Sequence, residues 1–161
     1  MKTTRSQVAA LLAVAGLTMV GLSRRIRDEG LSIRGDVAAP PAIEAILKRS
    51  CYDCHSNETR WPWYGYVAPL SWWLEREVAF GRKQLNFSEW GSYYATTKIR
   101  KLQWIDRTLN EENMPPWSYR ILHPDAALNR TDLLLLQQWI ESELASQRSQ
   151  QRPHTTEEHL Q

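Results

Sequence analysis

The chain has 161 residues, enough for one domain with a hydrophobic core and too few for two comfortable ones. Its 20 basic and 18 acidic residues leave a net charge of +2 with both signs scattered, so no basic face predicts nucleic-acid binding. Eight Trp and six Tyr stand against two Phe. This bias indicates amphipathic rings that line an environment part apolar and part wet.

Residues 1–23 are interpreted as a signal peptide or an N-terminal membrane anchor. Lys2 and Arg5 precede an uncharged, mostly apolar run from Gln7 to Leu22, a pattern typical of segments that direct export. No clear A-x-A cleavage site ends the run, which favours an uncleaved anchor. The run is nevertheless shorter than the roughly 20 residues that a helix needs to cross a bilayer. Cleavage therefore stays open, and under both interpretations the rest of the chain is exported.

The remainder divides by composition into a linker at residues 24–38, a domain at 39–145 and a polar tail at 146–161 that we expect to be disordered. His154 and His159 lie in that tail and are poor ligand candidates.

Hydrophobic periodicity predicts four helices in the domain. The first begins at Pro41 and runs into Cys51, and the second spans Leu70 to about Leu85. The third spans Tyr93 to Leu109, and the fourth begins after an N-cap at Asn129. Their expected buried residues are Ile43, Ile46, Leu47, Trp73, Val78, Phe80, Tyr94, Ile99, Leu102, Trp104, Ile105, Leu109, Leu133, Leu136, Trp139, Ile140 and Leu144. No segment alternates convincingly with period two, so the predicted fold is all-α, and the proline-rich stretch before Asn129 is expected to be loop.

The only two cysteines, Cys51 and Cys54, are followed directly by His55. A thioredoxin-like site would need a βαβ pattern, a structural zinc site would need two further ligands, and a disulfide would leave His55 unexplained. C-x-x-C-H is the signature of c-type haem attachment, in which two thiols form thioethers and the histidine binds iron. We therefore expect one covalently bound haem c.

The segment that follows the motif is rich in side chains suited to a buried porphyrin. Arg60, Trp61, Trp63 and Tyr64, with Tyr66 beyond them, offer hydrogen-bond donors on apolar bodies. About half of them are expected simply to fill the core. A loop carbonyl near Pro69 is a candidate acceptor for the Nδ1–H of His55, because a ligating histidine needs an acceptor to fix its orientation.

Met114 is the candidate for the second axial position on iron. It is the only methionine outside the leader, and it stands in the rigid sequence Asn113-Met114-Pro115-Pro116. His123 is the rival ligand, and an open distal position is the third possibility.

A helix leading into C-x-x-C-H, a later Met-Pro loop and a closing amphipathic helix resemble class I cytochrome c. The segments SCYDCHSNETRWPWYGYVAPLSWWLEREVAFGRKQLNFSEW and MPPWSYRILHPDAALN more specifically resemble the bacterial haem-binding domain family, Haem_bd, over roughly residues 39–145. The family resemblance implies haem c on Cys51 and Cys54 with His55 as ligand, in an exported bacterial protein. The class I pattern implies Met114 as sixth ligand and a proline carbonyl behind His55, where this chain has Ala68-Pro69 in place of Gly-Pro.

With both axial positions filled by protein, we predict an electron carrier rather than an enzyme, working between unidentified redox proteins. We place it on the periplasmic side of the bacterial inner membrane, anchored there or soluble after cleavage. One alternative is a peroxidase-like enzyme or gas sensor with an open distal site, served by His123, Glu111 or Glu112. Another is a haem-bearing subunit of a larger respiratory complex.

Overall fold

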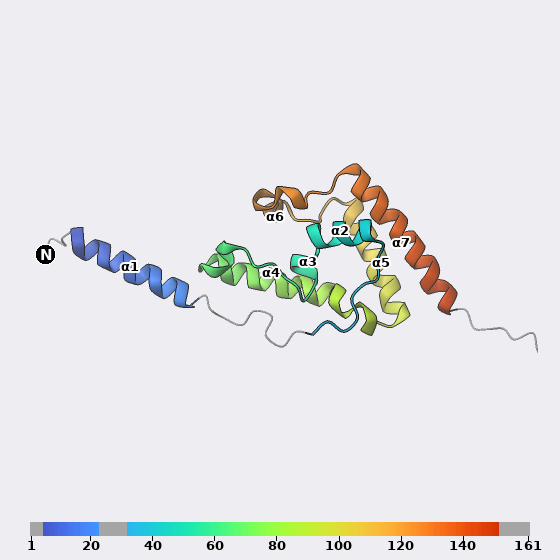
Figure 1. The fold of residues 1–161 in the computed structure, drawn as a ribbon, viewed down its shortest axis with the longest axis horizontal. Coiled ribbons are helices and arrows are strands. Elements are labelled where there is room, and N and C mark those ends of the chain that lie inside the picture. Colours follow the sequence, from blue (N-terminus) through green and yellow to red (C-terminus); the bar gives the residue numbers. More distant parts are fainter. Residues whose placement is uncertain (1–4, 23–31, 152–161) are drawn as a thin grey trace, which may run out of the picture.

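The computed structural model describes residues 5–22 and 32–151. Within these ranges every regular element is helical and no strand is present, which confirms the all-α prediction. The α-helices are α1 (Arg5–Leu22), α2 (Pro41–Ser50), α3 (Tyr52–His55), α4 (Leu70–Gln84), α5 (Ala95–Asn110), α6 (Trp117–Leu122) and α7 (Arg130–Gln151), shown in Figure 1, and the 3-10 helices are η1 (Trp63–Tyr66), η2 (Phe87–Ser92) and η3 (Pro124–Ala126).

Helix α1 covers most of the predicted leader, and its side chains from residue 5 to residue 18 are exposed. No helix in the described ranges is both long enough and apolar enough to span a membrane. Residues 1–4 and 23–31, which hold the ends of the predicted leader and most of the linker, lie outside the described residues. Membrane anchoring therefore stays a prediction.

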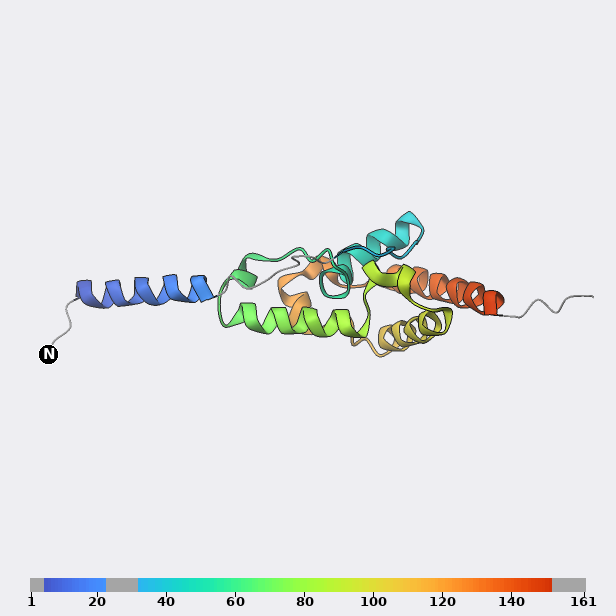
Figure 2. The same ribbon diagram turned by 90° about the horizontal axis from the view of Figure 1, so that it is seen from below.

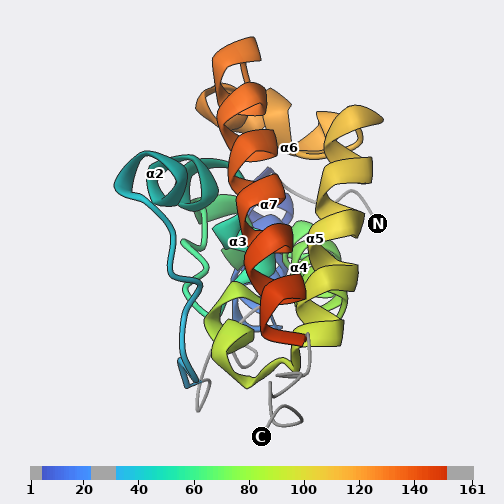
Figure 3. The same ribbon diagram turned by 90° about the vertical axis from the view of Figure 1, so that its right-hand side faces the viewer.

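The main hydrophobic core lies between α2, η2, α5 and α7. Helices α5 and α7 run side by side, as Figure 3 shows, and α2 packs against α7. The buried members of this core include Ile43, Ile46, Leu47, Phe87, Trp90, Leu102, Ile105, Leu109, Leu136, Trp139 and Ile140. Most of these were expected from helical periodicity, because the side of an amphipathic helix that is apolar is the side it buries.

Helix α7 begins at Arg130, directly after the predicted N-cap Asn129. The Asn129 side chain accepts a hydrogen bond from the Asp132 backbone N–H at 2.9 Å, and Asp132 accepts from the Asn129 N–H at 3.0 Å. This reciprocal pair satisfies two N–H groups that the first helical turn would leave unbonded. Asp132 also binds Arg49 of α2 at 2.7 Å, which joins the two helices.

The structure corrects several predicted boundaries. Residues 146–151 continue α7 and are not a disordered tail, whereas residues 152–161 lie outside the described part. The end of the predicted linker docks onto the domain, since Val37 is buried and the Gly91 N–H donates to the Gly35 carbonyl at 2.7 Å. A short helix, α6, forms within the stretch that was predicted to be loop.

Candidate functional site

Helix α3 presents the Cys-x-x-Cys-His motif on a single short turn. The α2 backbone breaks at Cys51, and the N–H groups of Cys54 and His55 both donate to the Cys51 carbonyl, at 3.2 and 2.9 Å. Tyr52 anchors the turn in the core, where its ring stacks on the ring of Phe87 with centroids 5.4 Å apart. The two thiols and the imidazole are thus held by one rigid segment.

The ring of His55 is oriented by two backbone carbonyls at the end of α4. Its Nδ1 lies 3.0 Å from the Gly81 oxygen and 3.1 Å from the Leu85 oxygen. Because a carbonyl can only accept, Nδ1 carries the proton and Nε2 keeps its lone pair for a metal. Burial lowers the pKa of His55, which favours this neutral, ligating form.

These partners overturn the expectation that the acceptor lies near Pro69. Pro69 precedes the first residue of α4, whereas Gly81 and Leu85 lie at the far end of that helix. Helix α4 packs beside α3, as Figures 1 and 2 both show, and so its C-terminal carbonyls reach the imidazole. The Gly81 carbonyl also accepts from the Leu85 backbone N–H at 2.9 Å, and its second lone pair remains available for His55.

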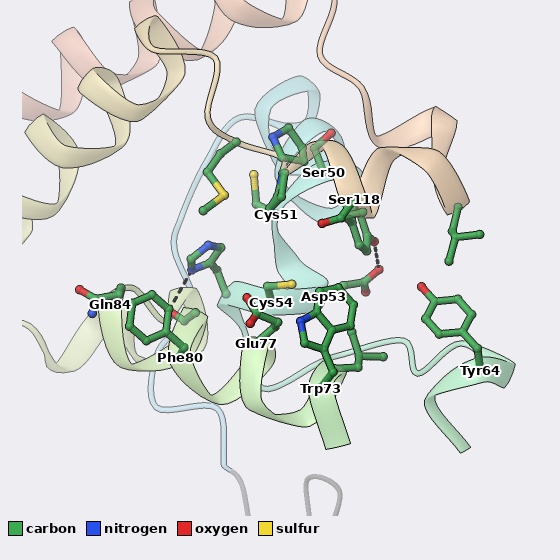
Figure 4. A pocket seen from close by; sticks show the side chains of 18 of the residues that line it. Ser50, Cys51, Asp53, Cys54, Tyr64, Trp73, Glu77, Phe80, Gln84 and Ser118 are labelled. Atoms are coloured by element: carbon green, nitrogen blue, oxygen red, sulfur yellow. Dashed lines mark hydrogen bonds between the residues drawn. The ribbon is translucent and has the colours of Figure 1, made fainter. Parts of the chain in front are cut away.

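A cavity of about 190 Å³ opens in front of the motif. One wall carries Cys51, Cys54 and His55, and a second is formed by one face of α4. The third comes from the segment that holds Met114, Pro115, Pro116, Tyr119 and Leu122. Figure 4 shows Cys51 and Cys54 at this cavity, with Trp73, Glu77 and Phe80 of α4 facing them.

The α4 wall is built by Trp73, Glu77, Phe80 and Gln84, whose spacing of three or four residues places them on one helix face. Trp73 and Phe80 were predicted to be core residues, but they are 46% and 60% exposed. The buried face of α4 instead carries Ser71, Leu74, Val78 and Gly81. The periodicity was visible in the sequence, but it does not tell a core face from a ligand-facing one.

The structure separates the two candidates for the second axial position. Met114 is partly buried in the cavity wall. His123 is not part of that wall, because its Nε2 lies 2.8 Å from the Tyr64 hydroxyl and its ring stacks on Tyr119 at 4.2 Å. Of the two, only Met114 shares the cavity with His55.

Of the predicted aromatic neighbours, only Tyr64 lines this cavity. Trp61 packs with Tyr64, Leu74 and Val78 in a small separate cluster. Trp63 is 78% exposed and Tyr66 is also exposed. Arg60 forms an ion pair with Asp53, and Pro69 is the N-cap residue of α4. Apart from Tyr64, the structure does not bring these side chains to the site.

Both cysteines are free thiols. Burial raises the pKa of Cys51 to about 12 and that of Cys54 to about 11, so both stay protonated near neutral pH. Two protonated thiols are therefore available at this turn for covalent chemistry.

The profile of the haem-binding domain family, Haem_bd, matches residues 12–142, which is most of the chain. The chain belongs to this family. No curated protein and no solved structure matches the chain. Membership in Haem_bd makes it a haem-binding protein, as the resemblance implied.

The residues of the cavity fit a haem in this Haem_bd protein. An oriented imidazole, two thiols and a thioether converge on one space, and exposed apolar side chains of α4 and α6 face it. Ser50 Oγ is buried in the wall and has no hydrogen-bond partner among the described residues. Exposed apolar surface and an orphaned buried polar atom are both expected where a ligand completes a site.

Proposed function

We propose that this haem-binding domain is a single-haem c-type cytochrome that transfers one electron at a time outside the cytoplasm. The observation that carries the proposal is the shared cavity, in which the Cys51-x-x-Cys54-His55 turn faces Met114. That combination of side chains matches covalent attachment with two axial ligands from protein.

Cys51 and Cys54 would each form a thioether by adding the thiol across one vinyl group of the porphyrin. The sulfur bonds to one vinyl carbon and the thiol hydrogen goes to the other, so the addition consumes no oxidant. The one-turn geometry of α3 supports this role, because it holds both thiols beside the imidazole. Such attachment keeps the group on the protein even after unfolding.

His55 would supply one axial ligand through Nε2 and Met114 the other through its sulfur. When bound, the haem supplies reversible one-electron chemistry at iron. The chain's task is to fix both ligands, exclude water with Trp73, Phe80 and Leu122, and leave no position for substrate. Histidine with methionine ligation also raises the reduction potential relative to a second histidine.

The proposed location is the periplasmic side of a bacterial inner membrane, with an unidentified redox protein as donor and another as acceptor. The charge and apolar pattern of residues 1–23 supports export, whether or not this segment is cleaved.

The test is an absorption spectrum of the purified full-length protein, oxidised and reduced, with a haem-stained denaturing gel. We expect a six-coordinate c-type spectrum, a weak red band from thioether-ligated ferric haem, and a stained polypeptide. Cys51→Ala combined with Cys54→Ala should abolish the stain, and expression without residues 1–23 should give little haem protein. Full covalent haem in the double variant would refute the proposal.

A further inference from the structure

Helix α6 follows Met114 after only two prolines and continues the cavity wall, yet none of its residues is buried. Trp117, Ile121 and Leu122 are all more than half exposed. Hydrophobic burial in the protein alone therefore contributes little to holding α6 in place. Other contacts must therefore fix this helix, which continues the chain from Met114.

The strongest such contact is between Tyr119 and Asp53. The Tyr119 hydroxyl donates to the Asp53 carboxylate at 2.6 Å, a short hydrogen bond to a charged acceptor. Asp53 stands between Cys51 and Cys54 in the turn of residues 51–55, named the haem-attachment turn here for its proposed role. This bond therefore joins α6 directly to the segment that carries the proposed haem attachment and His55.

The Asp53 carboxylate is held in place by hydrogen bonds from Arg60 to both of its oxygens. It is 8% exposed, and Arg60 donates its backbone N–H and Nε to one carboxylate oxygen, both at 3.1 Å, and Nη2 to the other at 3.2 Å. A buried carboxylate is tolerated only with such pairing and hydrogen bonding. The bonds from Arg60 thus hold the Asp53 carboxylate in the place where it accepts from Tyr119.

Tyr119 is held in the donor form and in a fixed plane. Burial, together with the hydrogen bond to Asp53, raises the pKa of Tyr119, so the phenol stays protonated at neutral pH. Its ring stacks on His123 with an interplanar angle of 10°, and His123 is in turn bonded to Tyr64.

We propose that Asp53 is a positioning residue that, through Tyr119, fastens α6 to the haem-attachment turn and so holds Met114 against the iron. The inference rests on the proposed function, since it concerns the sulfur ligand assigned there. Asp53 acts at a distance, through α6, and gives up no proton or electron.

The decisive variant is Tyr119→Phe in the full-length holoprotein, because it removes the hydroxyl and keeps the stacked ring. Imidazole is titrated into the ferric protein, and loss of the red thioether band reports displacement of Met114. We expect the imidazole concentration at half-displacement to fall about tenfold, equivalent to about 1.4 kcal/mol. Asp53→Ala should lower it at least as far. The combined variant should resemble Asp53→Ala alone, because both changes break one bond.

Asp132→Asn is the matched control, because it weakens a buried carboxylate pair between α2 and α7 that lies outside the cavity wall. We expect it to lower the melting temperature and to leave the imidazole titration unchanged. If Asp53 only stabilised the fold, Tyr119→Phe and Asp132→Asn proteins of equal melting temperature would be half-displaced at equal imidazole concentrations. That result would overturn the proposal.

Fastening of α6 is also measured without haem, in the Cys51→Ala, Cys54→Ala protein. Trypsin cleavage after exposed Arg120 on α6 should be faster when Tyr119→Phe is added. Unchanged cleavage means that the bond does not hold α6, and the inference is wrong.

If wild type shows the thioether band and Tyr119→Phe has no effect on the titration, only the inference fails. If wild type lacks the band, the axial assignment in the proposed function fails and takes the inference with it.

Discussion

A Cβ atom added at Gly81 would lie 2.5 Å from the carbonyl oxygen of Cys54. Helix α4 and the haem-attachment turn therefore touch backbone to backbone at this point, and no side chain fits between them. The same glycine offers its own carbonyl to His55 Nδ1 at 3.0 Å. Close packing at Gly81 thus sets both the position of the thiols and the direction of the imidazole.

Gly81→Ala should destabilise the protein although alanine is the better helix former. The helix propensity gain is at most about 1 kcal/mol, whereas overpacking against rigid backbone costs about 1–3 kcal/mol or more. Displacing α4 also pulls the carbonyls of Gly81 and Leu85 away from His55. We expect a lower unfolding free energy by denaturant titration and a lower haem content.

Gly65→Ala is the control for this change. A Cβ at Gly65 would meet a side-chain carbon of Leu74 at 3.1 Å, and a flexible side chain can yield where backbone cannot. The loss of stability should be smaller and the haem content unchanged. Equal effects at Gly65 and Gly81 would contradict the special role given to Gly81.

Met114→Ala should leave covalent haem intact, lower the reduction potential and open iron to carbon monoxide or cyanide. Loss of the thioether removes the ligand that raises the potential. Met114→His should restore six-coordination, also at a lower potential than wild type. Both variants should lack the red band, as measured by absorption spectroscopy and redox titration.

His123→Ala is the matched variant for Met114→Ala, because it removes the rival ligand. His123 lies outside the cavity wall and is bonded to Tyr64. The red band should persist in this variant. A wild-type spectrum without the band, altered by His123→Ala, would assign the ligand to His123 instead.

Phe80→Ser should affect the haem-bound and haem-free proteins differently. Phe80 is 60% exposed on the cavity face of α4, so in the Cys51→Ala, Cys54→Ala protein the change should alter stability by no more than about 0.5 kcal/mol. In the haem protein it should cost about 1–2 kcal/mol, because the ring then loses buried apolar contact. Denaturant unfolding of both forms measures the difference.

Val78→Ala provides the comparison on the opposite face of α4, where Val78 is 2% exposed. It should destabilise both forms by about 1–3 kcal/mol, since it leaves a space in the packed protein whether or not haem is bound. A Phe80 effect that is equal in the two forms would mean that this face does not contact haem.

The native protein should turn over hydrogen peroxide very slowly and should exchange electrons quickly and reversibly with small one-electron donors. With both axial positions on iron filled, as proposed, no site is left for peroxide, so catalysis should appear only in Met114→Ala or after partial unfolding. Fast peroxide turnover by wild type would favour the enzyme alternative.

N-terminal sequencing of protein from the membrane and soluble fractions should find the uncleaved start in the membrane fraction. The apolar run from Gln7 to Leu22 has no clear cleavage site, which is the reason for this expectation. A mature protein that begins after Leu22 and is found in the soluble fraction would instead indicate a cleaved signal peptide.

The sequence by itself determined the features that depend on neighbours along the chain. The spacing of Cys51, Cys54 and His55 predicted a haem-attachment site because all three chemical groups fall within one helical turn. Periodicity located the buried stripe of α7, and the Asn129 cap followed from hydrogen bonding within that first turn. Each of these depends on interactions over a few residues.

Only the tertiary structure decided which distant groups meet. The acceptors of His55 lie 26 and 30 residues further along the chain, at the C-terminal end of α4, whereas the sequence had pointed to the loop near Pro69. Trp73 and Phe80 looked like core residues because a helix face that lines a cavity has the same apolar spacing as one that packs against protein. Met114 and His123 could be separated only by where α6 lies, and a hydrogen bond between residues 66 apart, Tyr119 and Asp53, helps to hold it there.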